Sequence, residues 1–96
     1  MAMPGNHNGW VVTDVAFNMG NINTQKENHD WMMQSVTFGS DDELKFAADN
    51  AWEFNWGSEE FPYGTGIPYG MNIPVVAGTY DIFFNDITGQ FNFISK

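Results

Sequence analysis

Short stretches with apolar residues at every second position, separated by glycine, proline and asparagine turns, restrict the fold of this chain more than any other feature. The clearest stretch covers residues 79–85, in which Tyr80, Ile82 and Phe84 share one parity. A period of two is typical of a strand with one buried face. No stretch has the apolar period of a helix. Many short strands with turns about every eight to twelve residues predict an antiparallel β-sandwich.

The C-terminal part of the chain has the pattern of a β-hairpin. Residues 86–89 (DITG) suit a turn in which Gly89 takes the left-handed conformation, and residues 90–95 supply the second strand. Together with the strand near position 45, this hairpin provides the predicted core: Tyr80, Ile82, Phe84, Phe91, Phe93, Leu44 and Phe46.

Residues 44–57 (LKFAADNAWEFNWG) are expected to form two strands around a turn. In the first half, Leu44 and Phe46 alternate with Lys45, so that Lys45 faces water if the apolar residues face the core. Asp49-Asn50 is a typical turn pair. The second half resumes the alternation up to residue 56.

Three large aromatic residues, Trp52, Phe54 and Trp56, share one parity in that second half. Core packing is the ordinary explanation for each of them taken alone. Trp52, however, follows the turn directly and lies within reach of the outward-facing Lys45. We therefore expect Trp52 to be exposed.

The remaining segments are less regular. Residues 31–38 are a predicted strand with Met32, Val36 and Phe38 on one face, and residues 73–76 a short edge strand interrupted by Pro74. Residues 18–29 are polar and predict a loop in which His29 is solvated. Residues 58–72, rich in glycine, proline and tyrosine, predict a long loop beside the site or away from it, with Tyr63 or Tyr69 as the candidates for a third stacking surface. On this interpretation, deletion of residues 61–66 leaves the fold intact.

Composition excludes several classes of function. The formal net charge is −9, with three basic residues, which argues against nucleic acid and against anionic membrane surfaces as partners. Two histidines and no cysteine make a transition-metal site unexpected. The acidic residues 41–43 lack the spaced oxygen ligands of a calcium loop. We expect no metal and no cofactor.

The chain is short and uninterrupted by linker-like segments, which predicts one domain over residues 1–96. No run is long enough for a transmembrane helix, and the first residues lack the regions of a signal peptide. The MAMP start looks like the beginning of a domain excised from a multidomain protein. Any leader or lipid anchor then lies outside this segment.

Three motifs in this order and spacing carry a resemblance to a known family. They are PGNHNGW at residues 4–10, LKFAADNAWEFNWG at residues 44–57 and NIPVVAGTYDIFFNDITGQFNFI at residues 72–94. They resemble one module of the SusE/SusF family, outer-membrane starch-binding lipoproteins built as strings of immunoglobulin-like β-sandwich domains. The resemblance implies binding of an α-glucan on the extracellular face of the outer membrane. It also implies other domains and glycan-uptake components as partners.

The same resemblance implies the site. Trp10, from the NGW turn, and Trp52 fall on the positions that form an aromatic arc against the starch helix, and Lys45 falls on a donor to sugar hydroxyls. Trp56 matches a structural position. Many relatives have a further basic residue where this chain has Ala47. At the hairpin turn, Asn85 or Asp86 is expected to add a polar contact.

Indoles and amide or amino donors suit a neutral sugar on chemical grounds, because an indole covers the C–H face of a glucose ring and the donors select hydroxyl positions. Two alternatives remain open. A spacer domain that binds nothing would use Trp10 and Trp52 for packing. A glycosidase would need two carboxylates, for which Glu59-Glu60 with Glu53 or Asp49 are the candidates; adjacent glutamates on a strand point to opposite faces, so we expect no enzyme.

Overall fold

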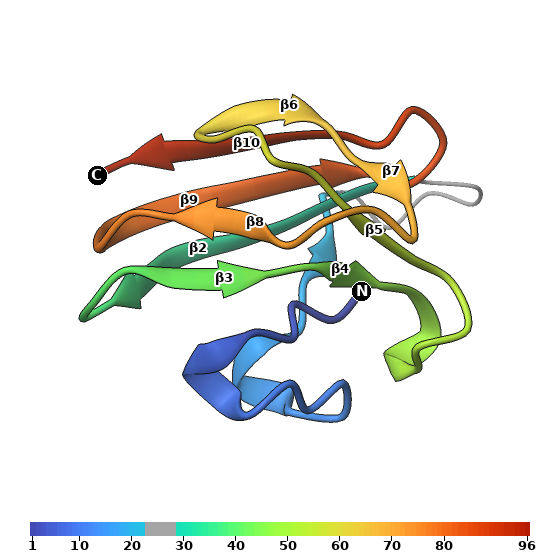
Figure 1. The fold of residues 1–96 in the computed structure, drawn as a ribbon, viewed down its shortest axis with the longest axis horizontal. Coiled ribbons are helices and arrows are strands. Elements are labelled where there is room, and N and C mark those ends of the chain that lie inside the picture. Colours follow the sequence, from blue (N-terminus) through green and yellow to red (C-terminus); the bar gives the residue numbers. More distant parts are fainter. Residues whose placement is uncertain (23–28) are drawn as a thin grey trace.

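A five-stranded antiparallel sheet forms the back layer of the computed structural model, which describes residues 1–22 and 29–96 (Figure 1). Its central strands are β2, β9 and β10, and short edge strands flank them. In spatial order the strands are β1 (Gly20–Asn21), β2 (Asp30–Phe38), β9 (Gly78–Asn85), β10 (Gln90–Ser95) and β6 (Tyr63–Thr65). The predicted hairpin is confirmed, with Gly89 at φ 79° in its turn.

The front layer consists of two smaller antiparallel sheets. One pairs β3 (Asp42–Leu44) with β8 (Ile73–Val75), and the other orders β4 (Phe46–Ala47), β5 (Asn55–Gly57) and β7 (Ile67–Pro68). β3 and β4 continue each other on either side of Lys45. The N-terminal residues run antiparallel beside them, with bridges from Ala2 to Ala47 and from Gly5 to Leu44.

Three 3-10 turns complete the described chain: η1 (Asn6–Asn8), η2 (Val15–Phe17) and η3 (Ala48–Asn50). The described residues contain no α-helix, and therefore none with the length and apolarity needed to traverse a bilayer. The fold is a compact all-β domain of antiparallel sheets, as the alternation predicted.

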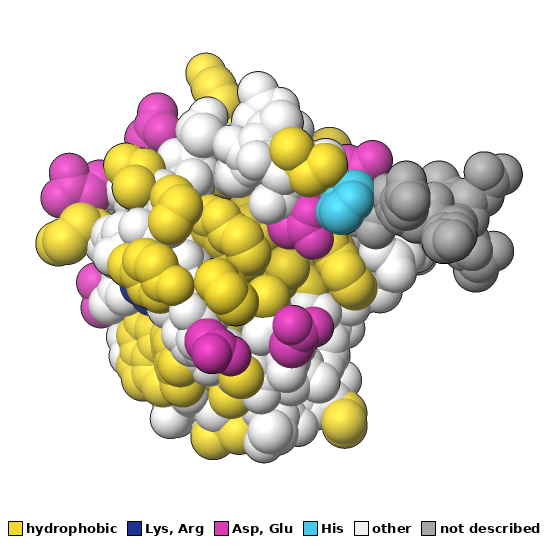
Figure 2. All heavy atoms as spheres, turned by 90° about the vertical axis from the view of Figure 1, so that its right-hand side faces the viewer, with side chains coloured by type: hydrophobic (Ala, Val, Ile, Leu, Met, Phe, Trp, Pro, Cys, Tyr) yellow, Lys and Arg dark blue, Asp and Glu magenta, His cyan; other side chains and the backbone are white. Residues whose placement is uncertain are grey.

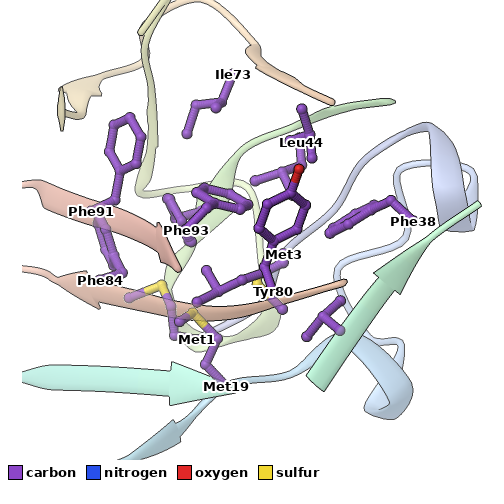
Figure 3. Packing of buried hydrophobic residues seen from close by; sticks show 14 residues of the cluster. Met1, Met3, Met19, Phe38, Leu44, Ile73, Tyr80, Phe84, Phe91 and Phe93 are labelled. Atoms are coloured by element: carbon purple, nitrogen blue, oxygen red, sulfur yellow. The ribbon is translucent and has the colours of Figure 1, made fainter. Parts of the chain in front are cut away.

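One hydrophobic core lies between the two layers, and every predicted core residue is buried in it. Phe46 of β4 stacks on Phe84 of β9, with ring centroids 4.3 Å apart and planes within 10°. Figure 3 shows Phe84, Phe91 and Phe93 near Met3, Leu44 and Ile73, which come from the N-terminal segment and the front layer. The segment preceding Pro4 contributes Met1 and Met3 to this core.

The predicted face of β2 is wrong at one residue. The register with β9 shifts between Met33 and Val36, and Ser35 has φ 54°. This bulge inserts an extra residue and reverses the alternation. Met33, not Met32, therefore packs against the core with Val36 and Phe38.

The prediction of a loop over residues 58–72 is also wrong. β6 pairs with β10, and β7 pairs with β5. Phe61, at the start of this segment, packs against Phe93 and Tyr80 with centroids 5.2 and 5.7 Å away. Proline and glycine concealed both strands, because each is only two or three residues long and occupies a sheet edge. The loop predicted at residues 18–29 contains β1, and its residues 23–28 lie outside the described part.

Candidate functional site

Trp10 follows a turn that is stabilised by hydrogen bonds from side chains and backbone. The side chain of Asn8 accepts a hydrogen bond from the Gly5 amide (3.2 Å) and donates one to the Val11 carbonyl (3.1 Å). The Trp10 amide donates to the Gly5 carbonyl at 2.9 Å. Within this turn Gly9 takes φ 67°, as the Asn-Gly pair predicts, and Trp10 takes φ 64°.

The indole of Trp10 is fixed at its polar end. Its Nε1 donates to the Asn6 Oδ1 at 3.0 Å. Asn6 belongs to η1, which His7 ties to the body of the domain: the His7 Nδ1 lies 3.0 Å from the Asp42 Oδ2, and its Nε2 lies 2.9 Å from the Met3 carbonyl. The turn therefore presents Trp10 from a fixed support.

Trp52 approaches from the other side, from the segment between η3 and β5. The ring centroids of Trp10 and Trp52 lie 6.2 Å apart, and the ring planes are inclined by 35°. Trp52 is 41% exposed, which confirms the prediction of an exposed ring, and Trp10 is half-buried. The two predicted indoles thus form one tilted aromatic surface.

The expectation that residues 51–56 form a strand with three aromatics on one face is wrong for its first four residues. β5 begins only at Asn55. Trp56 is partly buried and packs against Phe84 at 5.1 Å, whereas Phe54 is 57% exposed. Segment 51–54 pairs with no strand in the described part of the chain; the side chains of Asn55 and Tyr69 bind two of its carbonyls instead.

Lys45 lies on the outer side of the β3–β4 strand, between the buried Leu44 and Phe46. Its backbone amide donates to the Pro4 carbonyl at 2.9 Å, next to the Gly5 carbonyl that holds Trp10. Partial burial lowers the pKa of the Lys45 ammonium below its ordinary value. Within the described part of the chain, no carboxylate lies within ion-pair distance of it.

Asn85 and Asp86 lie at the end of β9, in the back layer, and both are engaged locally. Asp86 accepts hydrogen bonds from the Trp31 Nε1 at 3.1 Å and lies 2.7 Å from the His29 Nδ1. Asn85 donates to the Asp30 Oδ1 and accepts from residues of its own turn. No hydrogen bond joins them to Trp10 or Trp52 in the described structure, so their contact with a ligand stays a prediction.

Of the carboxylates considered for catalysis, Glu60 is hydrogen-bonded within its own turn. The Glu60 Oε1 accepts hydrogen bonds from the Thr65 amide at 3.2 Å and from the Ser58 hydroxyl at 3.5 Å. This carboxylate therefore closes the turn before β6. Among the described residues there is no group of three or more His, Asp or Glu side chains that would suit a metal ion.

Hydrophobic side chains gather on the side of the molecule where η3, β5 and β7 lie, with acidic side chains beside and between them (Figure 2). The exposed aromatic residues of these elements and their loops are Trp52, Phe54 and Tyr69.

Sequence reasoning missed Asn6 and Asn55, and it considered Tyr69 only as a third stacking ring, not as a hydrogen-bond donor to the Glu53 carbonyl. Asn6 belongs to an asparagine-rich turn, and the sequence does not indicate which of its polar residues accepts the hydrogen bond from the Trp10 indole. Asn55 follows an aromatic residue on a predicted strand, and Tyr69 lies in a segment interpreted as a loop. Only the pairing of β5 with β7 brings Asn55 and Tyr69 together. Comparison with protein-family models, with curated proteins and with solved structures finds no match for this chain.

Proposed function

We propose that this domain binds α-glucan, as starch or maltooligosaccharide, without catalysis. The observation that carries the proposal is the Trp10–Trp52 pair: two indoles from separate segments lie 6.2 Å apart at the surface, inclined by 35°. Two inclined planes suit the curved face of an α-linked glucan better than a flat chain. Each indole covering a glucose face removes about 60–80 Å² of apolar surface from water, or about 1.5–2 kcal/mol at roughly 25 cal/mol per Å².

The backbone around the indoles supports a role in recognition. Non-glycine residues with positive φ are uncommon and cluster at functional sites. The described chain has five of them, and four belong to the segments that carry or support the indoles: Trp10, Asp49, Asn50 and Tyr69. A packing role alone would not require a tryptophan in a conformation that favours glycine.

Lys45 supplies the polar part of the proposed site. The chain has a net charge of −9, yet in the described structure no carboxylate pairs with Lys45, so its ammonium group remains available to a ligand. Its three N–H donors suit sugar hydroxyls, each hydrogen bond contributing about 1 kcal/mol net. With the costs of association included, we expect a dissociation constant from tens of micromolar to about 1 mM.

The resemblance to the SusE/SusF family supports the same ligand and extends the proposal. The two layers then form an immunoglobulin-like sandwich, within a multidomain lipoprotein on the outer face of the outer membrane. Its partners there are the other domains and the components of the glycan-uptake system.

Titration of maltoheptaose, followed by calorimetry and tryptophan fluorescence, tests the proposal. Trp52→Ala is expected to weaken binding more than tenfold, a loss of about 1.5–2 kcal/mol, with little change in the unfolding temperature because the ring is exposed. The control is Tyr63→Ala, which removes an aromatic ring that is 70% exposed on β6, in the back layer.

The alternatives give different results. A wild-type protein that binds no maltoheptaose at millimolar concentration would be a spacer domain. Release of reducing ends from amylose would identify an enzyme. Equal weakening by Trp52→Ala and Tyr63→Ala would place the glucan site elsewhere.

A further inference from the structure

Residues 51–54, which include Trp52, are held in their conformation by hydrogen bonds from two side chains. Its two central carbonyls are bound in succession: the Asn55 Nδ2 donates to the Trp52 carbonyl at 2.9 Å, and the Tyr69 hydroxyl donates to the Glu53 carbonyl at 2.6 Å. The Ala48 amide donates to the Phe54 carbonyl at 2.8 Å. These hydrogen bonds take the place of regular pairing with a neighbouring strand in the residues around the exposed indole of Trp52.

Tyr69 is held in place by its own backbone. It lies just after β7 with φ 58°, its amide donates to the Asn55 carbonyl at 2.8 Å, and the Gly70 amide donates to the Ile67 carbonyl at 2.9 Å. A Cβ at Gly70 would meet the Gly57 carbonyl oxygen at 2.6 Å, so the close approach of β5 requires glycine there. This turn directs the side chain of Tyr69 towards residues 51–54, where its hydroxyl binds the Glu53 carbonyl.

The exposure of Tyr69 shows that burial is not its main role. The residue is 62% exposed, yet its hydroxyl reaches a backbone carbonyl sixteen residues away in sequence. A left-handed conformation costs a non-glycine residue about 1–2 kcal/mol. The molecule retains this strain at a side chain that contributes little to the core.

Asn55 is the buried half of the same arrangement. Only 7% of the residue is exposed, and its Oδ1 accepts no hydrogen bond from any described residue. Its amide orientation follows from its partner, because the Trp52 carbonyl can only accept. Asn55 thus binds the Trp52 carbonyl while its own buried Oδ1 has no partner among the described residues, an arrangement that is rare because an unpaired buried oxygen destabilises the fold.

We propose that Tyr69 is a positioning residue for the glucan site: together with Asn55 it holds segment 51–54, and thereby the Trp52 indole, in the orientation that matches Trp10. The inference rests on the proposed function of the Trp10–Trp52 pair. Tyr69 acts through Trp52, and its effect is pre-organisation, since a platform that is already ordered loses less entropy when the sugar binds.

Tyr69→Phe tests the proposal, because it removes only the hydroxyl. The matched control is Tyr63→Phe, at a more exposed tyrosine whose hydroxyl bonds to no described residue. The first measurement needs no ligand: NMR order parameters of the Trp52 indole and of the amides of residues 52–54. They are expected to fall in Tyr69→Phe and to stay at wild-type values in Tyr63→Phe.

The second measurement is the maltoheptaose dissociation constant of the same proteins. It is expected to rise about three- to tenfold in Tyr69→Phe, the effect of one hydrogen bond, with an unfolding temperature close to that of the control. Unchanged order parameters in Tyr69→Phe would overturn the proposal, and so would a mobile segment with unchanged affinity. A wild-type protein without sugar binding would refute the glucan site, while the order parameters would still decide whether Tyr69 holds Trp52.

Discussion

Trp10 combines a backbone that suits glycine with the largest side chain. Its φ of 64° follows that of Gly9, and the turn aligns the indole with Trp52. A left-handed conformation costs an alanine about 1–2 kcal/mol but costs glycine almost nothing. Mutation of Trp10 can therefore separate the backbone strain from the contact between its ring and Trp52.

Trp10→Ala and Trp10→Gly are expected to weaken maltoheptaose binding to the same extent, each by more than tenfold (about 1.5–2 kcal/mol), because both remove the ring. Trp10→Gly is expected to be the more stable of the two, by about 1 kcal/mol, since it relieves the backbone strain. Urea unfolding of both variants measures the difference. Equal stabilities would show that the turn relaxes to a negative φ once the indole is absent.

Lys45 illustrates a conflict between stability and binding. Its lowered pKa means that the charged form is less favourable in the folded chain than in the unfolded chain. The stability of the wild-type domain therefore rises with pH as the solution passes from the lowered pKa towards the ordinary pKa of lysine.

Lys45→Met is expected to weaken maltoheptaose binding about fivefold, through the loss of about 1 kcal/mol of hydrogen bonding. Its unfolding temperature near neutral pH is expected to equal or exceed that of the wild type, because the substitution removes the partly desolvated charge while keeping an apolar stem. The difference in unfolding temperature between Lys45→Met and the wild type is expected to become smaller at alkaline pH, where the lysine loses its charge. A clear drop in stability would reveal a structural role for the ammonium group.

At the residue scale, exposure and turn geometry were predictable, whereas hydrogen-bond partners were not. The position of Trp52 directly after Asp49-Asn50 indicated an exposed ring, and both turn residues do take positive φ. Its support from Tyr69 depends on β5 lying beside β7. No local pattern contains that pairing.

At the element scale, the long alternating strands were predictable and the short ones were not. The β9–β10 hairpin follows from its alternation and its turn. β6 and β7 are too short to show a period, and their glycines and prolines indicate a loop. The bulge in β2 reverses the alternation that sequence reasoning depends on, so Met32 and Met33 exchange faces.

Because residues 61–66 contain a strand, we expect their deletion to disrupt the fold, whereas the deletion of a loop would have left the fold intact. The deletion removes β6, an edge strand of the back sheet, and with it the ring of Phe61 that packs against Tyr80 and Phe93. The ring of Phe61 is partly buried, so its loss adds to the cost of losing the strand, and a small domain has only about 5–15 kcal/mol of stability in total. The deleted protein is expected to lack a cooperative thermal transition by circular dichroism; a retained transition would show that the back sheet tolerates the loss of its edge.

At the scale of the whole molecule, the core could be predicted because it draws on the regular strands. Phe46, Phe84, Phe91 and Phe93 come from the segments with the clearest alternation, and they pack together across the two layers. The N-terminal methionines also belong to this core, with Met3 fully buried. Their irregular neighbourhood gave no period from which to predict a face.

The net charge of −9 belongs to the whole molecule and sets a final test of the ligand class. Indole stacking and hydrogen bonds to a neutral sugar involve no ion pairing, and salt screens only charge–charge interactions between separated groups. Maltoheptaose affinity is therefore expected to change less than about twofold between about 0.05 and 0.5 M sodium chloride. A sulfated glucan of the same linkage, repelled by the acidic surface, is expected to bind more weakly and to gain affinity as salt rises. Calorimetric titration of both sugars across this range measures the contrast, and a steep loss of maltoheptaose binding with salt would show that charged groups, rather than the indoles, dominate the site.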